Sequence, residues 1–543
     1  MKKMIFTLLF SITFSINLFS DINLKLIHYS KAGNIEKVKE ALEKGANINT
    51  QDKYYGHTPL IWSIKNTHYE MAKFLINKDA DVNIKNNSGD TALYWAARIR
   101  KNLELSKLLI AKGADVNVKD KYGDTLLLKA SLSGNKPLIK LLLKSGADIY
   151  LKNRTGNSAL KYAFTYRRLD IARLILEHEI KLGLKNKGRT SLMIASMKED
   201  FNNVKQILSS KVSEKEVNKE DDYGMTALMW ASIKEHTDII QILLSKGADI
   251  DKTDDYGNTA LMWAVGSNQS YETAVLLILK GANVNTRNKN RAIPLIQAIK
   301  RKNFYIAEFL IEKGAGVNQT GNLGMTPLIQ ASKTGNLKIT GLLIEKGAHI
   351  NDKEKYGGKT PLMWACQKNH SSVVRFLIQK GATINTKSRF GDTALILAAR
   401  KGSTEVVKML LDAGAKVNVK CNSNYSPMIW AVINRNLEMV KLLVSKKPDL
   451  EIRDDNERTP LIYAVRRGYE NIAGFLIKSG SNVNAIDKYD YSSLMWALKR
   501  SRTSLIQLLI NKKADVNIRD DEGDTPFTWA LLNYRLNLVK LFL

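Results

Sequence analysis

The chain is poor in the residues that most catalytic and metal chemistry requires. Its 543 residues include two cysteines and seven histidines. The histidines are scattered and form no pair at metal-ligand spacing, so we expect each of them at the surface. No glycine-rich phosphate loop, nucleophile elbow or metal-spaced cysteine pair appears. We therefore predict no enzyme, no catalytic residues, no bound metal and no cofactor.

Long hydrophobic runs are also absent, except at the start of the chain. Lys2 and Lys3 precede an apolar stretch that ends near Ser20, which is typical of a secretory signal. Thr, Ser and Asn interrupt this short stretch, which disfavours a membrane anchor. We predict a signal peptide over residues 1–20 and no transmembrane anchor after its cleavage. The protein is then expected to leave a bacterial cytoplasm and to be periplasmic or secreted.

Acidic residues are scarce relative to basic ones, at 53 against 83, which gives a net charge of +30. The hydrophobic fraction of 44% and the charged fraction of 25% fit a folded soluble protein. The chain is nevertheless longer than one compact core normally holds. A solenoid would avoid this limit, because each of its units packs only on its neighbours.

The sequence contains a repeat of about 33 residues, a period that indicates a solenoid or another array. A Thr or Ser opens nearly every unit, as expected for an N-cap. Seven of the nine prolines occupy the position directly after the opening residue, which suits the first helical position. In the unit from Lys353 to Thr386, Thr360 opens a short helix, residues 371–379 form a second helix, and Gly381 ends it. Aspartates such as Asp120, Asp221, Asp254 and Asp454 recur before the openings and are predicted to form turns.

The T-P-L-x-x-A opening and strings such as GADVN at Gly113 and GATIN at Gly381 resemble the ankyrin repeat. The resemblance extends from Asp21 to Leu543 and implies an all-α ankyrin-repeat α-solenoid of about 15–16 stacked helix-turn-helix repeats with short β-turn or hairpin loops. One departure is uniform: the family's usual His, two residues after the Pro, is absent from every unit. The hydrogen bonds that this His makes to the neighbouring turn must therefore be met in another way.

The repeats are not all equal. Residues 21–50 lack the Thr-Pro opening and are predicted to form an N-terminal capping repeat. Regular repeats are expected over 51–184 and 223–543, the second set without a C-terminal cap. Residues 185–222 form a degenerate repeat, which indicates either a bend in the solenoid or sequence drift without geometric effect. Cys366 lies on a packing position and Cys421 in a turn, where we expect it to be exposed, and no bridge between them is predicted.

The tryptophans share one position, four residues after the opening Thr or Ser. On a helix with 100° per residue, Leu362, Ala365 and Cys366 define a buried side and Trp364 falls almost opposite. The resemblance implies that first helices line a concave side, so the indoles are expected along an inner groove. They either form a ligand platform or pack between units, and both can hold. The tryptophans are Trp62, Trp95, Trp230, Trp263, Trp364, Trp430, Trp496 and Trp529.

Basic residues gather where the first helices end, and several follow a tryptophan by three or four positions. They either compensate helix dipoles or form a groove of alternating indoles and cations. With the eight tryptophans, Arg98, Arg466, Lys499 and Arg500 are the predicted partner-binding residues. We expect a protein–protein interaction scaffold that binds a partner with an acidic surface through the concave groove and turn tips. The alternatives are a binder of an anionic polymer, such as nucleic acid, acidic glycan or lipid headgroups, and a passive periplasmic spacer.

Overall fold

The computed structural model of the chain describes residues 22–98, 103–166, 168–181, 188–210, 213–266, 271–533 and 535–539. The predicted signal peptide, its cleavage site and residues 541–543 lie outside these ranges. The described residues form helices joined by turns. Their only β-structure consists of isolated bridges, such as that between Lys119 and Thr125. None of these helices has the length and hydropathy to cross a membrane. The predicted all-α class is confirmed.

The chain divides into two compact units. Unit 1 comprises residues 1–234 with 245–248, and unit 2 comprises residues 235–244 with 249–543. In unit 1, residues 22–32 are helical and precede a series of helices. These are α2 (Ile35–Glu43), α3 (Pro59–Lys65), α4 (Tyr69–Asn77), α5 (Ala92–Arg98), α6 (Leu103–Ala111), α7 (Leu126–Ser133), α8 (Lys136–Lys144), α9 (Ala159–Thr165), α10 (Leu169–Lys181), α11 (Ser191–Met197), α12 (Phe201–Ser209), α13 (Glu214–Val217) and α14 (Ala227–Lys234).

Unit 2 continues the same pattern after α15 (Thr237–Ser245). Its first helices are α16 (Ala260–Val265), α18 (Pro294–Lys300), α20 (Pro327–Thr334), α22 (Pro361–Lys368), α24 (Ala394–Lys401), α26 (Pro427–Ile433), α28 (Pro460–Arg467), α30 (Ser493–Lys499) and α32 (Pro526–Leu532). Its second helices are α17 (Glu272–Leu279), α19 (Phe304–Glu312), α21 (Leu337–Glu345), α23 (Ser371–Gln379), α25 (Thr404–Asp412), α27 (Leu437–Val444), α29 (Glu470–Lys478), α31 (Thr503–Asn511) and α33 (Leu536–Val539), and a 3₁₀ turn η1 (Asn322–Gly324) precedes α20.

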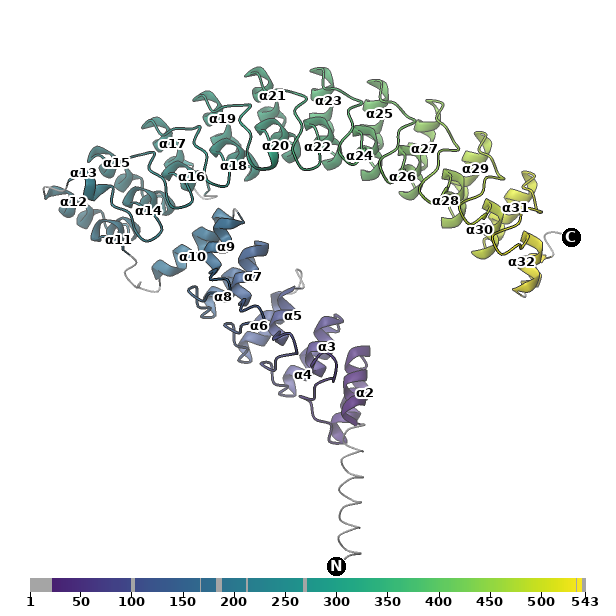
Figure 1. The fold of residues 1–543 in the computed structure, drawn as a ribbon, viewed down its shortest axis with the longest axis horizontal. Coiled ribbons are helices and arrows are strands. Elements are labelled where there is room, and N and C mark those ends of the chain that lie inside the picture. The colour runs from purple at the N-terminus through teal and green to yellow at the C-terminus, as the bar shows by residue number, and fades with distance from the viewer. Residues whose placement is uncertain are drawn as a thin grey trace, which may run out of the picture. The chain divides into compact units, whose positions relative to one another are not determined.

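The helices of unit 2 form two parallel rows. Each first helix packs on its own second helix and on the first helix of the next repeat, as α22 does with α23 and α24. From α17 to α31, each second helix likewise contacts the next second helix, as α23 does with α25. Within unit 2 the rows bend together, with the first helices on the inner side (Figure 1). Such nearest-neighbour stacking is the defining property of a solenoid.

Local sequence explains where each helix begins. The hydroxyl of Thr360 accepts a hydrogen bond from the backbone N–H of Met363, and Pro361 occupies the first helical position of α22. The second helix of this repeat spans the predicted residues 371–379, and Gly381 follows with φ of +84°. The degenerate segment keeps a helix pair, α11 and α12, and α11 packs on α14. Whether the chain bends at residues 185–222 stays a prediction.

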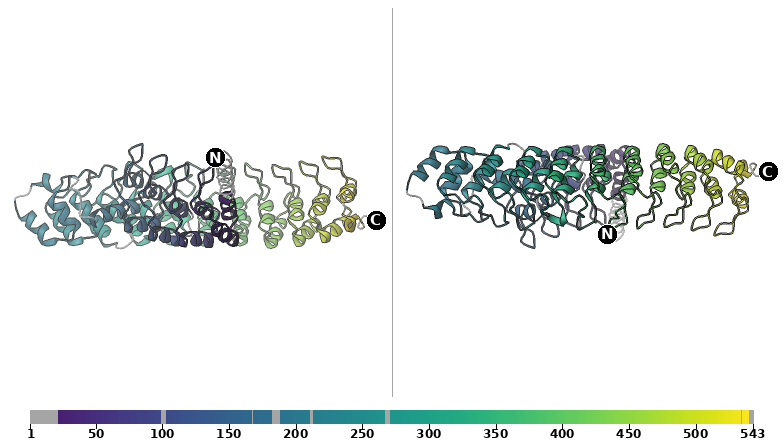
Figure 2. Two further views of the ribbon diagram at one scale, coloured as in Figure 1. Left: turned by 90° about the horizontal axis from the view of Figure 1, so that it is seen from below. Right: turned by 90° about the horizontal axis from the view of Figure 1, so that it is seen from above.

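Loops connect the rows and carry their own ladder of hydrogen bonds. In unit 2 the loops project from one side of the helix rows (Figure 2). At successive tips, the N–H of Lys355 donates to the carbonyl of Leu323 at 2.6 Å, and that of Arg389 donates to Gly357 at 2.9 Å. The N–H of Asn422 donates to Phe390 at 2.9 Å. The tips are therefore held in register by backbone contacts.

Both cysteines are free and buried. Cys366 lies in the helical core, where burial raises the pKa of its thiol. The expectation that Cys421 is exposed is wrong, because this turn position packs against Ile396 and Val419. The turn residues just before a first helix thus belong to the interior, and this shapes the surface described next.

Candidate binding surface

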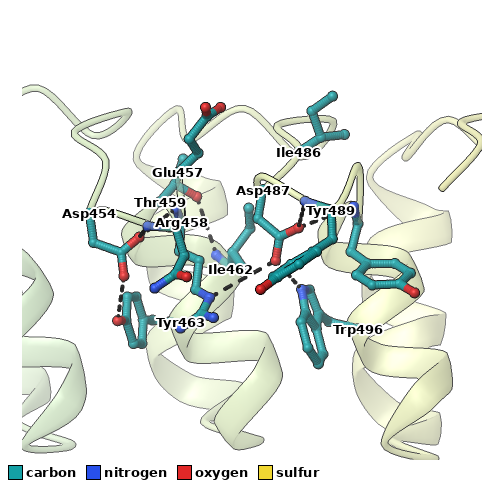
Figure 3. A network of polar contacts seen from close by, with 12 residues as sticks. Asp454, Glu457, Arg458, Thr459, Ile462, Tyr463, Ile486, Asp487, Tyr489 and Trp496 are labelled. Atoms are coloured by element: carbon teal, nitrogen blue, oxygen red, sulfur yellow. Dashed lines mark hydrogen bonds and ion pairs between the residues drawn. The ribbon is translucent and has the colours of Figure 1, made fainter. Parts of the chain in front are cut away.

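The turn aspartates use both carboxylate oxygens. Oδ1 of Asp487 accepts from the backbone N–H groups of Tyr489 at 3.0 Å and Tyr491 at 3.2 Å, which confirms the predicted turn role for this type of residue. Its Oδ2 accepts from the indole N–H of Trp496 at 2.8 Å (Figure 3). One repeat earlier, Oδ2 of Asp454 accepts from the hydroxyl of Tyr463 at 2.7 Å. The aromatic residue thus ties the first helix to its turn.

The same bond recurs in three further repeats. Indole N–H groups donate to turn aspartates from Trp62 to Asp52 at 3.0 Å, from Trp230 to Asp221 at 3.0 Å, and from Trp263 to Asp254 at 3.1 Å. This bond joins each turn to its helix in repeats that lack the opening His. It lies within one repeat and was not predicted from the sequence.

Other repeats lack the bond. The turn position of Trp430 is Cys421, which carries no carboxylate, and the buried indole N–H of Trp430 has no acceptor in the described structure. The indole N–H of Trp364 also has no acceptor within the described residues. The carboxylate of Glu354, at the turn position of this repeat, accepts instead from the backbone N–H groups of Tyr356, Gly357 and Lys359. The tryptophan position therefore contains two kinds of indole, bonded and unbonded.

For three tryptophans the structure favours packing between units, one of the two alternatives considered for this position. Trp62, Trp230 and Trp263 are only 6%, 0% and 1% exposed. The remaining five, Trp95, Trp364, Trp430, Trp496 and Trp529, are partly buried. The helical wheel describes how a first helix packs on its own second helix. It does not include contacts with the two neighbouring first helices or with the turn. Those neighbours cover the side that the wheel leaves open.

Cations cover several of the partly buried indoles. In unit 2, Lys333 lies 4.3 Å from the ring centre of Trp364, Arg400 lies 5.3 Å from Trp430, and Arg466 lies 4.7 Å from Trp496. We call these three pairs the cation–indole row. In each pair the cation comes from the preceding repeat, about one repeat length before the indole. In the sequence, this pairing corresponds to a cation about 30 residues before the tryptophan. The prediction from the sequence covered only cations three or four residues after the tryptophan, on the same helix.

The other predicted cations have different surroundings. Arg98 does pair within its own helix and lies 5.2 Å from Trp95. Lys499 lies over the ring of Tyr491 at 3.7 Å instead of over Trp496. Arg500 is exposed at the end of α30. The predicted residues therefore do not form one uniform groove, and their partner-binding role stays a prediction.

Like charges crowd the cation–indole row. Burial lowers the pKa of Lys333, and Lys368 and Lys300 lower it further. Burial also lowers the pKa of Arg466, with Arg458, Arg500 and Arg467 adding to the effect. The Nε of Arg466 is buried and has no hydrogen-bond acceptor within the described residues. Binding of an anionic ligand to such a surface is electrostatically favourable.

His57 departs from the expected surface position. It is only 3% exposed, and its ring lies 4.9 Å from that of Trp62 and 5.5 Å from that of Trp95. Burial lowers the pKa of His57, and the charge of Lys65 lowers it further. The imidazole therefore fills the space between two repeats in its neutral form at neutral pH.

One acidic group within the described residues has metal-like spacing. Carboxylate oxygens of Asp520, Glu522 and Asp524 lie within 4.8 Å of one another. However, Oδ1 of Asp520 accepts from the N–H groups of Glu522 and Asp524, as in the other turns. The turn role accounts for this cluster.

Family models describe the same repeats. A model for ankyrin repeats (3 copies) matches residues 26–120, 95–186, 126–219, 192–288, 267–354, 352–421 and 417–487, and one for ankyrin repeats (many copies) matches 494–543. A 63-residue stretch is 33% identical to the acyl-CoA-binding domain-containing protein 2 of Arabidopsis thaliana. That match covers 11% of this chain and 18% of the relative. The similarity to this relative is therefore confined to a short part of each protein.

Proposed function

Because the chain belongs to the ankyrin repeat family, whose repeats are generally protein–protein interaction modules and typically non-enzymatic, we propose that it is a scaffold for a partner protein. The partner binds the first-helix face of unit 2 and presents an acidic surface to it. The cation–indole row carries this proposal. Two of its cations, Lys333 and Arg466, are partly desolvated and lie near other positive charges, so carboxylates from a partner would relieve the repulsion.

The row also suits a protein better than a simple polyanion. Flat indoles beneath the cations supply apolar contact area, and Trp and Arg are the residues most enriched in binding hot spots. The net charge of +30 would speed the encounter with an acidic partner. We further propose that the encounter takes place outside the cytoplasm of a bacterial cell, since residues 1–20 have the pattern of an export signal.

The test is affinity capture from the native compartment with the full chain. The test variant combines Lys333→Gln with Arg466→Gln. The matched control combines Lys346→Gln with Lys408→Gln, which removes the same charge from exposed positions at the end of α21 and within α25. We expect the test variant to lose an acidic partner and the control to retain it, with circular dichroism showing that both are folded.

Other results would overturn the proposal. Equal capture of the same proteins by both variants would exclude the first-helix face. Capture that disappears after nuclease treatment would identify a nucleic-acid binder, whose affinity should fall steeply with salt. Capture of nothing by the wild type would favour a passive spacer.

A further inference from the structure

Three consecutive loop tips of unit 2 expose apolar side chains. Leu323, Tyr356 and Phe390 are 53%, 71% and 50% exposed. Single exposed apolar residues are common on soluble proteins. These three, however, occupy the tips of successive repeats, and the cores of those repeats are filled by other residues. Packing of the fold therefore gives no reason for their exposure.

The backbone holds these tips in line. The hydrogen bonds from Lys355 to Leu323, from Arg389 to Gly357 and from Asn422 to Phe390 join each tip to the one before. The loops of unit 2 project from one side of the helix rows (Figure 2). The three apolar residues belong to successive loops that these bonds join, so they follow the same edge. They are presented together rather than one at a time.

Exposed cations accompany the apolar residues. Lys353 and Lys355 precede Tyr356 at one tip, and Lys387 and Arg389 precede Phe390 at the next. The acidic residues in residues 353–359 and 387–392 are both buried. Glu354 accepts backbone N–H groups of its own turn, and Asp392 pairs with Arg400. Within these two ranges the exposed charged residues are therefore all basic.

We propose that this tip stripe, defined as Leu323, Lys355, Tyr356, Arg389 and Phe390, docks on the surface of an anionic lipid bilayer. Lysine and arginine near such a surface are attracted to its negative headgroups. Leucine and aromatic side chains gain energy by entering the headgroup region. The stripe is a second binding surface, formed by loops and separate from the cation–indole row on the first helices.

The geometry favours a bilayer over other anionic ligands. The apolar side chains project from the tips of loops, so they can enter a flat and deformable surface together. A single-stranded nucleic acid would use flat rings for base stacking, for which the aliphatic Leu323 has no use. The stripe also has a defined end, because a later tip exposes Asp455 and Glu457 instead of apolar residues.

The experiment uses the full chain and two kinds of vesicle. One contains phosphatidylcholine alone, and the other contains equal parts of phosphatidylcholine and phosphatidylglycerol. Co-sedimentation should show binding to the second kind only. Lys355→Glu with Arg389→Glu should weaken binding at least about tenfold, since each cation near an anionic surface contributes about fivefold or more. Tyr356→Ser with Phe390→Ser should weaken it without any change in charge.

A matched control separates docking from general attraction. Lys346→Glu with Lys408→Glu changes the net charge equally at exposed positions away from the tips, and should preserve affinity within about twofold. A nitroxide attached after Tyr356→Cys reports depth directly, because the native thiols of Cys366 and Cys421 are buried and should not react. On anionic vesicles this label should be shielded from an aqueous relaxation agent.

Three outcomes would overturn the inference. The first is absence of binding to the anionic vesicles. The second is equal weakening by the tip and control charge reversals, which would mean attraction by net charge alone. The third is a label that stays accessible to water on bound protein. Binding of single-stranded RNA or an acidic protein by the stripe, without vesicle binding, would assign it to that ligand instead.

Discussion

The indole N–H of Trp496 donates to Oδ2 of Asp487 at 2.8 Å, while Oδ1 of the same aspartate holds the turn. One carboxylate thus fixes both the loop and the helix of its repeat. Other donors occupy the same helix position in other repeats. The hydroxyl of Tyr463 bonds to Asp454, and the ammonium of Lys129 forms an ion pair with Asp120. These repeats therefore retain the contact while the donor changes.

The first prediction concerns the stability of this bond. Trp496→Phe should lower the free energy of unfolding by about 1.5–3 kcal/mol, because a charged acceptor loses its donor in a partly buried site. Trp430→Phe should cost less, since the indole N–H of Trp430 has no acceptor to lose. Urea denaturation measures the total loss, and hydrogen exchange of α26 and α30 locates it. Equal losses would mean that ring volume, not the hydrogen bond, sets the cost.

The second prediction adds the missing acceptor. Cys421 lies where other repeats have aspartate, and its N–H donates to Tyr425 at 3.1 Å, as that of Asp487 does to Tyr491. Cys421→Asp should therefore raise the free energy of unfolding by about 1 kcal/mol through a bond to Trp430. The gain should disappear in a chain that also carries Trp430→Phe. A gain of the same size in both backgrounds would assign it to the turn alone.

The third prediction concerns pH and His57. Its pKa is lowered in the folded state by burial and by Lys65, while in the unfolded chain it is expected near about 6.5. As the pH falls below that value, the unfolded state binds the proton first, so stability declines until the folded pKa is passed. His57→Gln should remove this part of the pH dependence. Thermal melting of both proteins between neutral and mildly acidic pH measures the difference, and identical slopes would contradict it.

The fourth prediction concerns export. Protein isolated from its native cell should begin near Ser20 or Asp21, because Lys2 and Lys3 precede an apolar stretch that ends there. Amino-terminal sequencing provides the measurement. A chain that retains Met1 in the cytosolic fraction would contradict export and would make cytoplasmic proteins the candidate partners.

Sequence patterns accounted for much of the local structure. Thr360 caps α22 and Pro361 begins it, because a hydroxyl acceptor and a residue without an N–H both fit a helix start. These effects act within a few residues and repeat with the period of the chain. The same reasoning predicted that Leu362, Ala365 and Cys366 are buried, and they are.

The sequence by itself thus determined the repeat, the helix boundaries and the side of each first helix that faces its partner helix, because these depend on local hydrogen bonds and helical periodicity. Only the tertiary structure decided what surrounds the tryptophans. The turn before α16 places the carboxylate of Asp254 where it accepts from the indole N–H of Trp263. The cation over Trp364 belongs to the preceding repeat. Stacking brings those groups within a few ångströms, and a helical wheel drawn for one helix contains none of them.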